Sequence, residues 1–181
     1  MTISELSARF GQKIKTPEEM RGIIGPRPRE KKVIMCHGVF DVVHPGHVRH
    51  LVYAKSKADI LIASLTSDRH IKKGPNRPHV PQELRALNLA AYEMVDHVII
   101  DDQETLLETL DLLQPDYFAK GYEYVADGIP STTQEEYAVL QSYGGEMIFT
   151  PGDVIYSSTQ LINLAPPSIQ IEKLLTLMDR E

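Results

Sequence analysis

The sequence predicts an α/β fold in which a parallel, doubly wound sheet of five strands forms one domain. Three observations support this. The chain has 181 residues, a length typical of one domain. Its apolar runs do not alternate with polar residues, which is typical of strands buried on both faces of a parallel sheet. Segments with helical apolar spacing separate these runs, so strand and helix alternate and indicate right-handed βαβ units.

The first thirty residues are predicted to be an N-terminal lead-in and linker, 1–30. The segment is polar, and the prolines of GPRPRE oppose a helix at its end. An earlier helix is expected to start at Thr16, which can cap it. Pro17 then takes the first helical position, and acidic residues fill the first turn.

The central part of the chain, 31–163, is predicted to be the α/β domain. Its five expected strands are 33–36, 59–68, 97–101, 116–121 and 145–150. Its expected helices, which show apolar residues at helical spacing, are 47–57, 82–95 and 104–114. A C-terminal helical extension, 164–181, is expected after Pro166 and Pro167, with an amphipathic helix over 169–178.

Composition argues against several classes of protein. Lys and Arg number 19 against 25 Asp and Glu, a net charge of −6, which disfavours a dedicated binder of duplex DNA or of an anionic membrane. No apolar run approaches the roughly 20 residues of a bilayer span. The first residues lack the order of a signal peptide. The single cysteine, Cys36, allows no internal disulfide. We therefore expect a cytoplasmic protein with neither a nucleic acid nor a membrane as partner.

The turn after the first central strand concentrates the chemistry. Ligands of open parallel sheets bind beyond the carboxyl ends of the strands, and here the chain reads HGVFDVVHPGH. Gly38 and Gly46 allow the backbone to approach a ligand closely. His44 and His47 lie three residues apart at a predicted helix start, whose N–H groups and dipole attract anions. The pattern suits a polyphosphate that gains negative charge in a transition state.

GVFDVVHPGH resembles the HxGH signature of the nucleotidyltransferase superfamily, which includes glycerol-3-phosphate and phosphocholine cytidylyltransferases. Three further segments resemble family elements in the family's order. Residues 156–162 (YSSTQLI) resemble ISSTxxI, 76–85 (NRPHVPQELR) resemble RPxxPxxxR, and 120–124 (KGYEY) resemble KGxDY with Glu123 for Asp. Within the superfamily, the heptose-1-phosphate adenylyltransferase domain is most similar, because it shares these segments and the GGE run at 144–146.

Two departures separate the chain from its relatives. Glycerol-3-phosphate cytidylyltransferases usually carry an arginine ahead of the hydroxyl triplet, where this chain reads TPGD at 150–153. The family's glycine two residues before that triplet is Ile155 here, which predicts a stiffer loop.

The resemblance implies a Rossmann-like enzyme that transfers a nucleoside monophosphate from ATP or CTP to a small phosphorylated substrate, a sugar 1-phosphate or polyol phosphate, with release of pyrophosphate. The catalytic residues that it implies are His44, His47, Lys72 and Lys73. The implied nucleotide-binding residues are Gly38, Val39, Phe40, Asp41, Gly46, Arg85, Ser157, Ser158 and Thr159. The implied substrate-binding residues are Lys120, Gly121, Tyr122, Glu123 and Tyr124. Mg²⁺ is expected on the triphosphate rather than on protein ligands, with Asp41 close enough to orient it or the substrate. A homodimer is also expected.

Structural interpretations compete with several of these assignments. The histidine pair could bind a metal, but no third ligand at suitable spacing accompanies it. Lys72 and Lys73 could be a solvated loop pair. Arg85 could form a salt bridge with Glu83 or another acidic residue. Cys36 is expected to be inert core.

Alternatives also exist for the whole protein. It could be a non-catalytic nucleotide-binding regulatory module on the same fold. An aminoacyl-ligase-like relative shares HxGH, but this chain lacks a KMSKS-like loop. The C-terminal helix could pack on its own sheet instead of supporting a dimer, or the chain could be cut from a longer, kinase-fused polypeptide after Pro166-Pro167.

Overall fold

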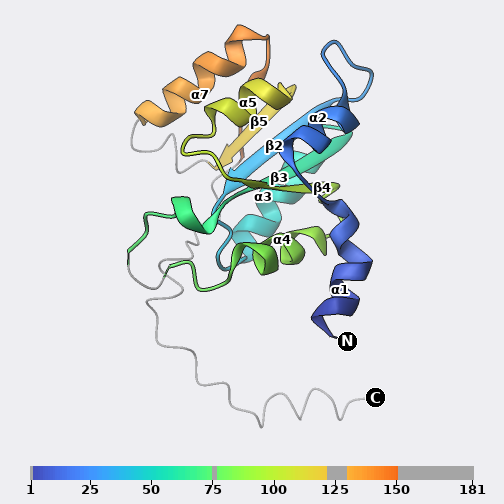
Figure 1. Ribbon diagram of the computed structural model, residues 1–181. Helices are drawn as coiled ribbons and strands as arrows, with labels where there is room; N and C mark the ends of the chain where they lie inside the picture. The colour runs from blue at the N-terminus through green and yellow to red at the C-terminus, as the bar shows by residue number, and fades with distance from the viewer. Residues whose placement is uncertain (1, 75–76, 122–129, 151–181) are drawn as a thin grey trace, which may run out of the picture.

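The computed structural model describes residues 2–74, 77–121 and 130–150. It contains one parallel sheet of six strands in the order β1-β4-β3-β2-β5-β6, with helices on both faces (Figure 1). The strands are β1 (Ile14–Lys15), β2 (Val33–Gly38), β3 (Ile60–Thr66), β4 (His97–Asp101), β5 (Tyr117–Gly121) and β6 (Glu146–Thr150). The predicted α/β class and parallel sheet are confirmed.

The predicted number of strands is wrong, because the sheet has six strands and not five. The additional strand, β1, lies within the segment assigned to the lead-in. Its residues pair with β4 in the register Ile14 to Val98 and Lys15 to Ile99. Two residues are too few to show an apolar pattern, so only the partner strand reveals this edge strand.

Six α-helices occur in the described residues: α1 (Ile3–Phe10), α2 (Pro17–Ile24), α3 (Pro45–Lys55), α4 (Gln82–Ala90), α5 (Leu107–Leu113) and α7 (Ser131–Ser142). Two short 3₁₀ helices, η1 (Gly11–Lys13) and η2 (Asp68–His70), follow α1 and β3. The helix expected over 82–95 ends earlier, at Ala90, and α7 was not predicted. The predicted helix over 169–178 lies outside the described residues.

The start of α2 matches its predicted cap. The Thr16 hydroxyl accepts a hydrogen bond from the Glu19 amide at 3.1 Å, and the Glu19 carboxylate accepts one from the Thr16 amide at 2.9 Å. Pro17 occupies the first helical position. This reciprocal arrangement satisfies two amides that a helix start would otherwise leave without partners.

Two apolar cores lie on opposite faces of the sheet. The first packs α3 and α4 against side chains such as Ile34 and Cys36 of β2. The second packs α2, α5 and α7 against Val33 and Met35 of the same strand. Figure 1 shows these two helical layers above and below the sheet. Since the side chains of residues 33–36 in β2 are all fully buried, the central place of this strand explains its unbroken apolar run.

The order of strands changes direction at β2. The chain proceeds from β2 through β3 to β4 on one side, and it returns to the other side of β2 as β5 and β6. The helix after β2, α3, covers one face, whereas α7, which follows β5, covers the other. In such sheets the switch point opens a crevice at the carboxyl ends of the strands, here those of β2 and β5. None of the helices in the part of the chain that the structure describes combines the length and the apolar composition of a membrane span.

Candidate functional site

The turn between β2 and α3 brings the predicted nucleotide-binding residues to the switch point. Phe40 adopts a positive φ of 50° and folds its ring back over Gly38. A Cβ atom at Gly38 would lie 3.4 Å from that ring, so glycine permits the close approach. Val39 and Gly46 lie in the same turn and at the start of α3. The turn therefore delivers the chain to the N-terminus of α3 around a buried aromatic ring.

The two histidines of the HxGH segment stack on each other at this helix start. Their ring centroids are 3.9 Å apart, and the His47 ring also contacts Phe40 with a centroid distance of 5.2 Å. His44 is the N-cap of α3 and is 7% exposed. Its backbone amide donates to Nδ1 of His47 at 3.4 Å. In the neutral His47 ring the proton is then on Nε2, where it can be donated to a ligand.

The surroundings of His47 favour its neutral form. Burial first, and then the charges of His44, His50 and Lys73, lower the pKa of His47 to about 3. A neutral imidazole that donates a hydrogen bond beside the positive end of a helix is suited to an anionic ligand. Lys73, one of the predicted catalytic residues, lies close enough for its charge to act on the His47 ring, and its catalytic role stays a prediction.

Asp41 organises the loop that follows η2. Its Oδ2 accepts a hydrogen bond from Nε of Arg77 at 2.6 Å, and its Oδ1 accepts from the amides of His79 and Val80 at 2.8 and 3.0 Å. Burial acts to raise the pKa of Asp41, but these hydrogen bonds and the Arg77 charge outweigh it, and the pKa is lowered. Asp41 is thus ionised and joins the β2–α3 turn to the RPxxPxxxR segment.

Arg85 is a buried brace of the same region, with 1% exposure. Its Nε donates to the Val80 carbonyl and its Nη1 to the Val39 carbonyl, while Nη2 donates to the Thr66 carbonyl at 2.9 Å. Nη2 also pairs with Asp68 at 2.6 Å. Arg85 therefore forms a salt bridge with an acidic residue, Asp68, which was the structural alternative to a nucleotide contact. Its contact with the nucleotide stays a prediction.

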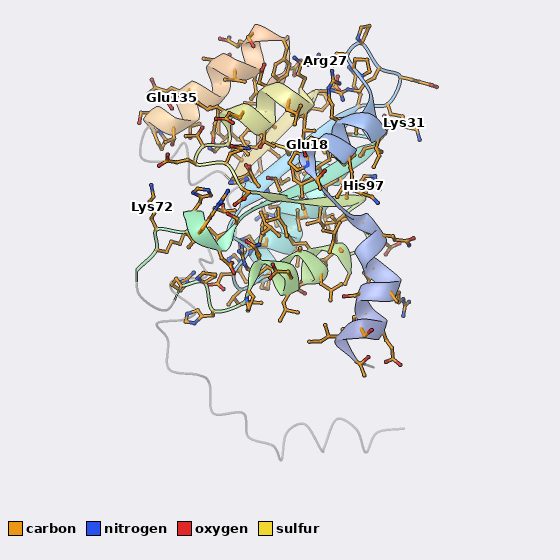
Figure 2. All side chains as sticks on the ribbon, viewed as in Figure 1. Glu18, Arg27, Lys31, Lys72, His97 and Glu135 are labelled. Atoms are coloured by element: carbon orange, nitrogen blue, oxygen red, sulfur yellow. The ribbon has the colours of Figure 1, made fainter. Side chains whose placement is uncertain are left out.

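The two loop lysines occupy different surroundings. Lys72 pairs with Glu104 at 3.3 Å, and both side chains are more than three-quarters exposed, so the pair contributes little to stability. Figure 2 shows Lys72 at the carboxyl end of the sheet, opposite Lys31 and His97. Burial and the charge of Arg77 lower the pKa of Lys73, while Asp41 raises it. Lys73, and not Lys72, is the lysine whose charge acts on His47.

Lys120, at the carboxyl end of β5, is paired with a carboxylate that the sequence did not indicate. Its Nζ forms a salt bridge with Glu136 of α7, and both residues are 9% exposed. Nζ also lies 5.6 Å from the centre of the Phe118 ring. Gly121 ends the strand. Lys120 and Gly121 both lie at the carboxyl end of β5, where the Lys120 side chain contacts α7, and their role in substrate binding stays a prediction.

A second polar group, missed by the sequence analysis, lies beside Lys120 on this face. The His37 ring contacts the Ser64 hydroxyl at 2.9 Å and the Thr66 hydroxyl at 3.1 Å. Asp101 approaches the ring at 4.0 Å and accepts a hydrogen bond from Thr109 at 2.9 Å. Burial, followed by the charge of Lys120, lowers the pKa of His37 to about 4. The register of β2 with β3 places His37 beside Ser64, and the register of β3 with β4 places Asp101 beside Thr66.

His50 is a further residue that the sequence analysis did not select. It lies on α3 one turn after His47, and its Nδ1 contacts the Thr150 hydroxyl at 3.0 Å. Burial lowers the pKa of His50 to about 4. The contact joins α3 to the end of β6, from which the chain continues toward Ser157, Ser158 and Thr159. These three residues, like Tyr122, Glu123 and Tyr124, lie outside the described residues.

The buried histidines predict a loss of stability in mild acid. The unfolded chain takes up protons on histidine near pH 6.5, whereas His37, His47 and His50 stay neutral in the fold until pH 4 or below. Protons therefore bind preferentially to the unfolded state, and the free energy of unfolding should fall as the pH drops from 7 to 4. Urea unfolding at several pH values measures this. His50→Gln should flatten the dependence, and an unchanged slope in that variant would contradict the assignment.

Comparisons with known proteins identify a matching family and several relatives. The cytidylyltransferase-like family matches residues 35–164. The bifunctional protein HldE of Syntrophotalea carbinolica is 36% identical over 141 residues, which cover 76% of this chain and 28% of that protein. HldE of Campylobacter jejuni subsp. doylei is 41% identical over 117 residues, 64% of this chain and 25% of that protein. The chain thus spans about a quarter of the length of these curated relatives.

Solved structures show a similar fold. A lipopolysaccharide core biosynthesis protein from Thermoplasma volcanium matches with a TM-score of 0.59 at 20% identity, covering 69% of this chain and all of the other. Pantoate-β-alanine ligase from Francisella tularensis matches with a TM-score of 0.58 at 14% identity, covering 93% of this chain and 79% of the other. At these identities the likeness concerns the fold alone.

Proposed function

Because this chain belongs to the cytidylyltransferase-like family, we propose that it transfers a nucleoside monophosphate from ATP or CTP to a sugar 1-phosphate or polyol phosphate. The observation that carries the proposal is the stacked pair of His44 and His47 at the N-terminus of α3. This pair lies at the switch point of the sheet, where open α/β folds bind ligands. The similarity to HldE supports the same class of reaction.

The reaction needs no protein nucleophile. A phosphate monoester dianion attacks the α-phosphorus, the new P–O bond forms, and the bond to the pyrophosphate leaving group breaks. Catalysis then depends on positioning and on donors aimed at the charge that develops. Nε2–H of His47 and the amides at the start of α3 supply such donors, and Lys73 contributes a positive charge nearby.

Mg²⁺ is proposed to bind to the triphosphate. Both oxygens of Asp41 already accept hydrogen bonds from the protein, so this carboxylate serves the loop. Within the described ranges, no group of three histidine, cysteine or acidic residues could hold a metal ion. The ion would neutralise charge on the triphosphate, which the nucleotide itself carries into the site.

The acceptor is proposed to be a sugar or polyol phosphate rather than a cation such as phosphocholine. A quaternary ammonium group needs an aromatic cage, and the chain has no tryptophan and only 7% aromatic residues. The carboxyl ends of β2, β3 and β5 present instead His37, Thr66 and Lys120, whose side chains suit hydroxyl and phosphate groups.

An assay of pyrophosphate release with a panel of nucleoside triphosphates and acceptor phosphates tests the proposed function. Pyrophosphate release should occur with ATP or CTP and at least one sugar phosphate, and kcat/KM for phosphocholine should be lower. Nucleotide binding without pyrophosphate release for any acceptor would favour the alternative, a non-catalytic regulatory module. An equal or higher kcat/KM for phosphocholine would refute the acceptor class.

The assembly and location are part of the proposal as well. A homodimer would cover exposed apolar side chains such as Ile3 and Ile23 of α1 and α2. Light scattering at micromolar concentration decides between one chain and two. The buried thiol of Cys36 suits a reducing compartment such as the cytoplasm.

A further inference from the structure

Arg77 has one end of its guanidinium group satisfied and the other end without a partner. The side chain is 8% exposed, and Nε donates to Asp41. Nη2 is buried and has no hydrogen-bond acceptor. A buried charged donor without an acceptor is costly, and such groups in native proteins require an explanation.

The position of Arg77 indicates what could supply the acceptor. Asp41, its partner, lies in the turn that leads from β2 to His44. The charge of Arg77 lowers the pKa of Lys73, and the charge of Asp41 raises it. The charge of Lys73 in turn lowers the pKa of His47. Asp41 holds Arg77 beside the turn that leads to the histidine pair, and Lys73 carries a second positive charge that acts on His47. An anion bound at the start of α3 would be attracted by both charges.

The comparison with Arg85 makes the difference between the two arginines clear. Arg85 uses Nε, Nη1 and Nη2 for carbonyl oxygens and for Asp68. Its donors are directed at the protein. Arg77 pairs with Asp41 through Nε, and its buried Nη2 has no acceptor. Of the two arginines in the RPxxPxxxR segment, Arg77 thus retains the donor that a ligand can use.

We propose that Arg77 is a further nucleotide-binding residue, whose Nε is held by Asp41 while Nη2 donates to an anionic oxygen of the triphosphate. This inference rests on the proposed function. A planar guanidinium group can bridge two anions in this way because its five N–H donors point along several edges. A lysine cannot, because its ammonium group is a single point charge on a flexible stem. The contact strengthens as negative charge accumulates on the leaving pyrophosphate.

The test measures binding separately from turnover. Titration calorimetry measures the affinities of the parent and of Arg77→Lys for ATP, CTP and inorganic pyrophosphate. The variant keeps a positive charge for Asp41 but loses the second donor edge. The affinity of Arg77→Lys for each of these ligands that the parent binds should be lower than that of the parent by about tenfold or more. The matched control is Arg69→Lys, because Arg69 is an exposed arginine paired with Asp102. Its affinities should stay within about twofold of the parent.

A second pair of variants guards against a folding defect. Asp41→Asn can still accept the amides of His79 and Val80, and the double variant Asp41→Asn/Arg77→Gln leaves no buried charge behind. The double variant should bind pyrophosphate more weakly than Asp41→Asn alone, although it should melt at an equal or higher temperature because the single variant leaves the Arg77 charge buried without its partner. Equal affinities in that pair, or Arg77→Lys within about twofold of the parent, would overturn the inference. Absence of turnover with every acceptor would instead refute the proposed function and leave the pyrophosphate result intact.

Discussion

Replacing His47 with alanine is expected to lower kcat about 10²–10³-fold while the protein stays folded. The same loss is expected for His44→Ala. The two rings stack on each other at the N-terminus of α3, where the dipole and amides of the helix already favour an anion. Because the histidines act on charge that appears in the transition state, the KM for the triphosphate should change far less than kcat.

The hydrogen bond between the His44 amide and Nδ1 of His47 allows a sharper version of this experiment. Asparagine at position 47 can replace the Nδ1 acceptor but has no donor at the position of Nε2. Glutamine can place an amide donor near Nε2. His47→Asn should therefore be more stable than His47→Ala but as inactive, whereas His47→Gln should retain more activity. Steady-state kinetics and thermal unfolding measure both properties, and near-parental turnover of His47→Ala would refute the role.

Much of the central sheet could be predicted from the sequence because its strands are buried on both faces. Val33 to Cys36 form an unbroken apolar run, and the structure makes them the middle of the sheet. The edge strand at 14–15 has no such pattern, since only its pairing with β4 defines it. The helix α7 was missed because its sequence, STTQEEYAVLQS, is mostly polar and buries few residues.

The predicted site shows the same division. HxGH could be located because a glycine-containing turn after a central strand is a local feature of the sequence. The partners of these residues could not, because they come from distant parts of the chain. Arg77 meets Asp41 across 36 residues, and His50 meets Thr150 across 100. Such contacts depend on the order and register of the strands, which no local pattern encodes.

Lys120→Met is expected to destabilise the protein by about 3–5 kcal/mol, because it leaves the carboxylate of Glu136 buried without its partner. Both residues are 9% exposed. Burial raises the pKa of Glu136, and the hydrogen bond and charge of Lys120 lower it. Without Lys120 the pKa should rise further, so Glu136 would be protonated more readily in the fold. The deficit should consequently be larger at pH 7 than at pH 4.5, as urea unfolding at the two values would show.

The double variant Lys120→Met/Glu136→Gln separates the structural role of Lys120 from its predicted role in binding the acceptor. Removing both charges should restore most of the stability, since no unpaired ion remains buried. An ammonium group has three donors, so Lys120 can hold Glu136 and also bind a substrate phosphate. If it does, the double variant should fold well yet show a raised KM for the sugar phosphate and a nearly unchanged KM for the triphosphate. If the double variant recovers both stability and acceptor KM, Lys120 acts only through its ion pair with α7, and the acceptor phosphate must be bound by other residues.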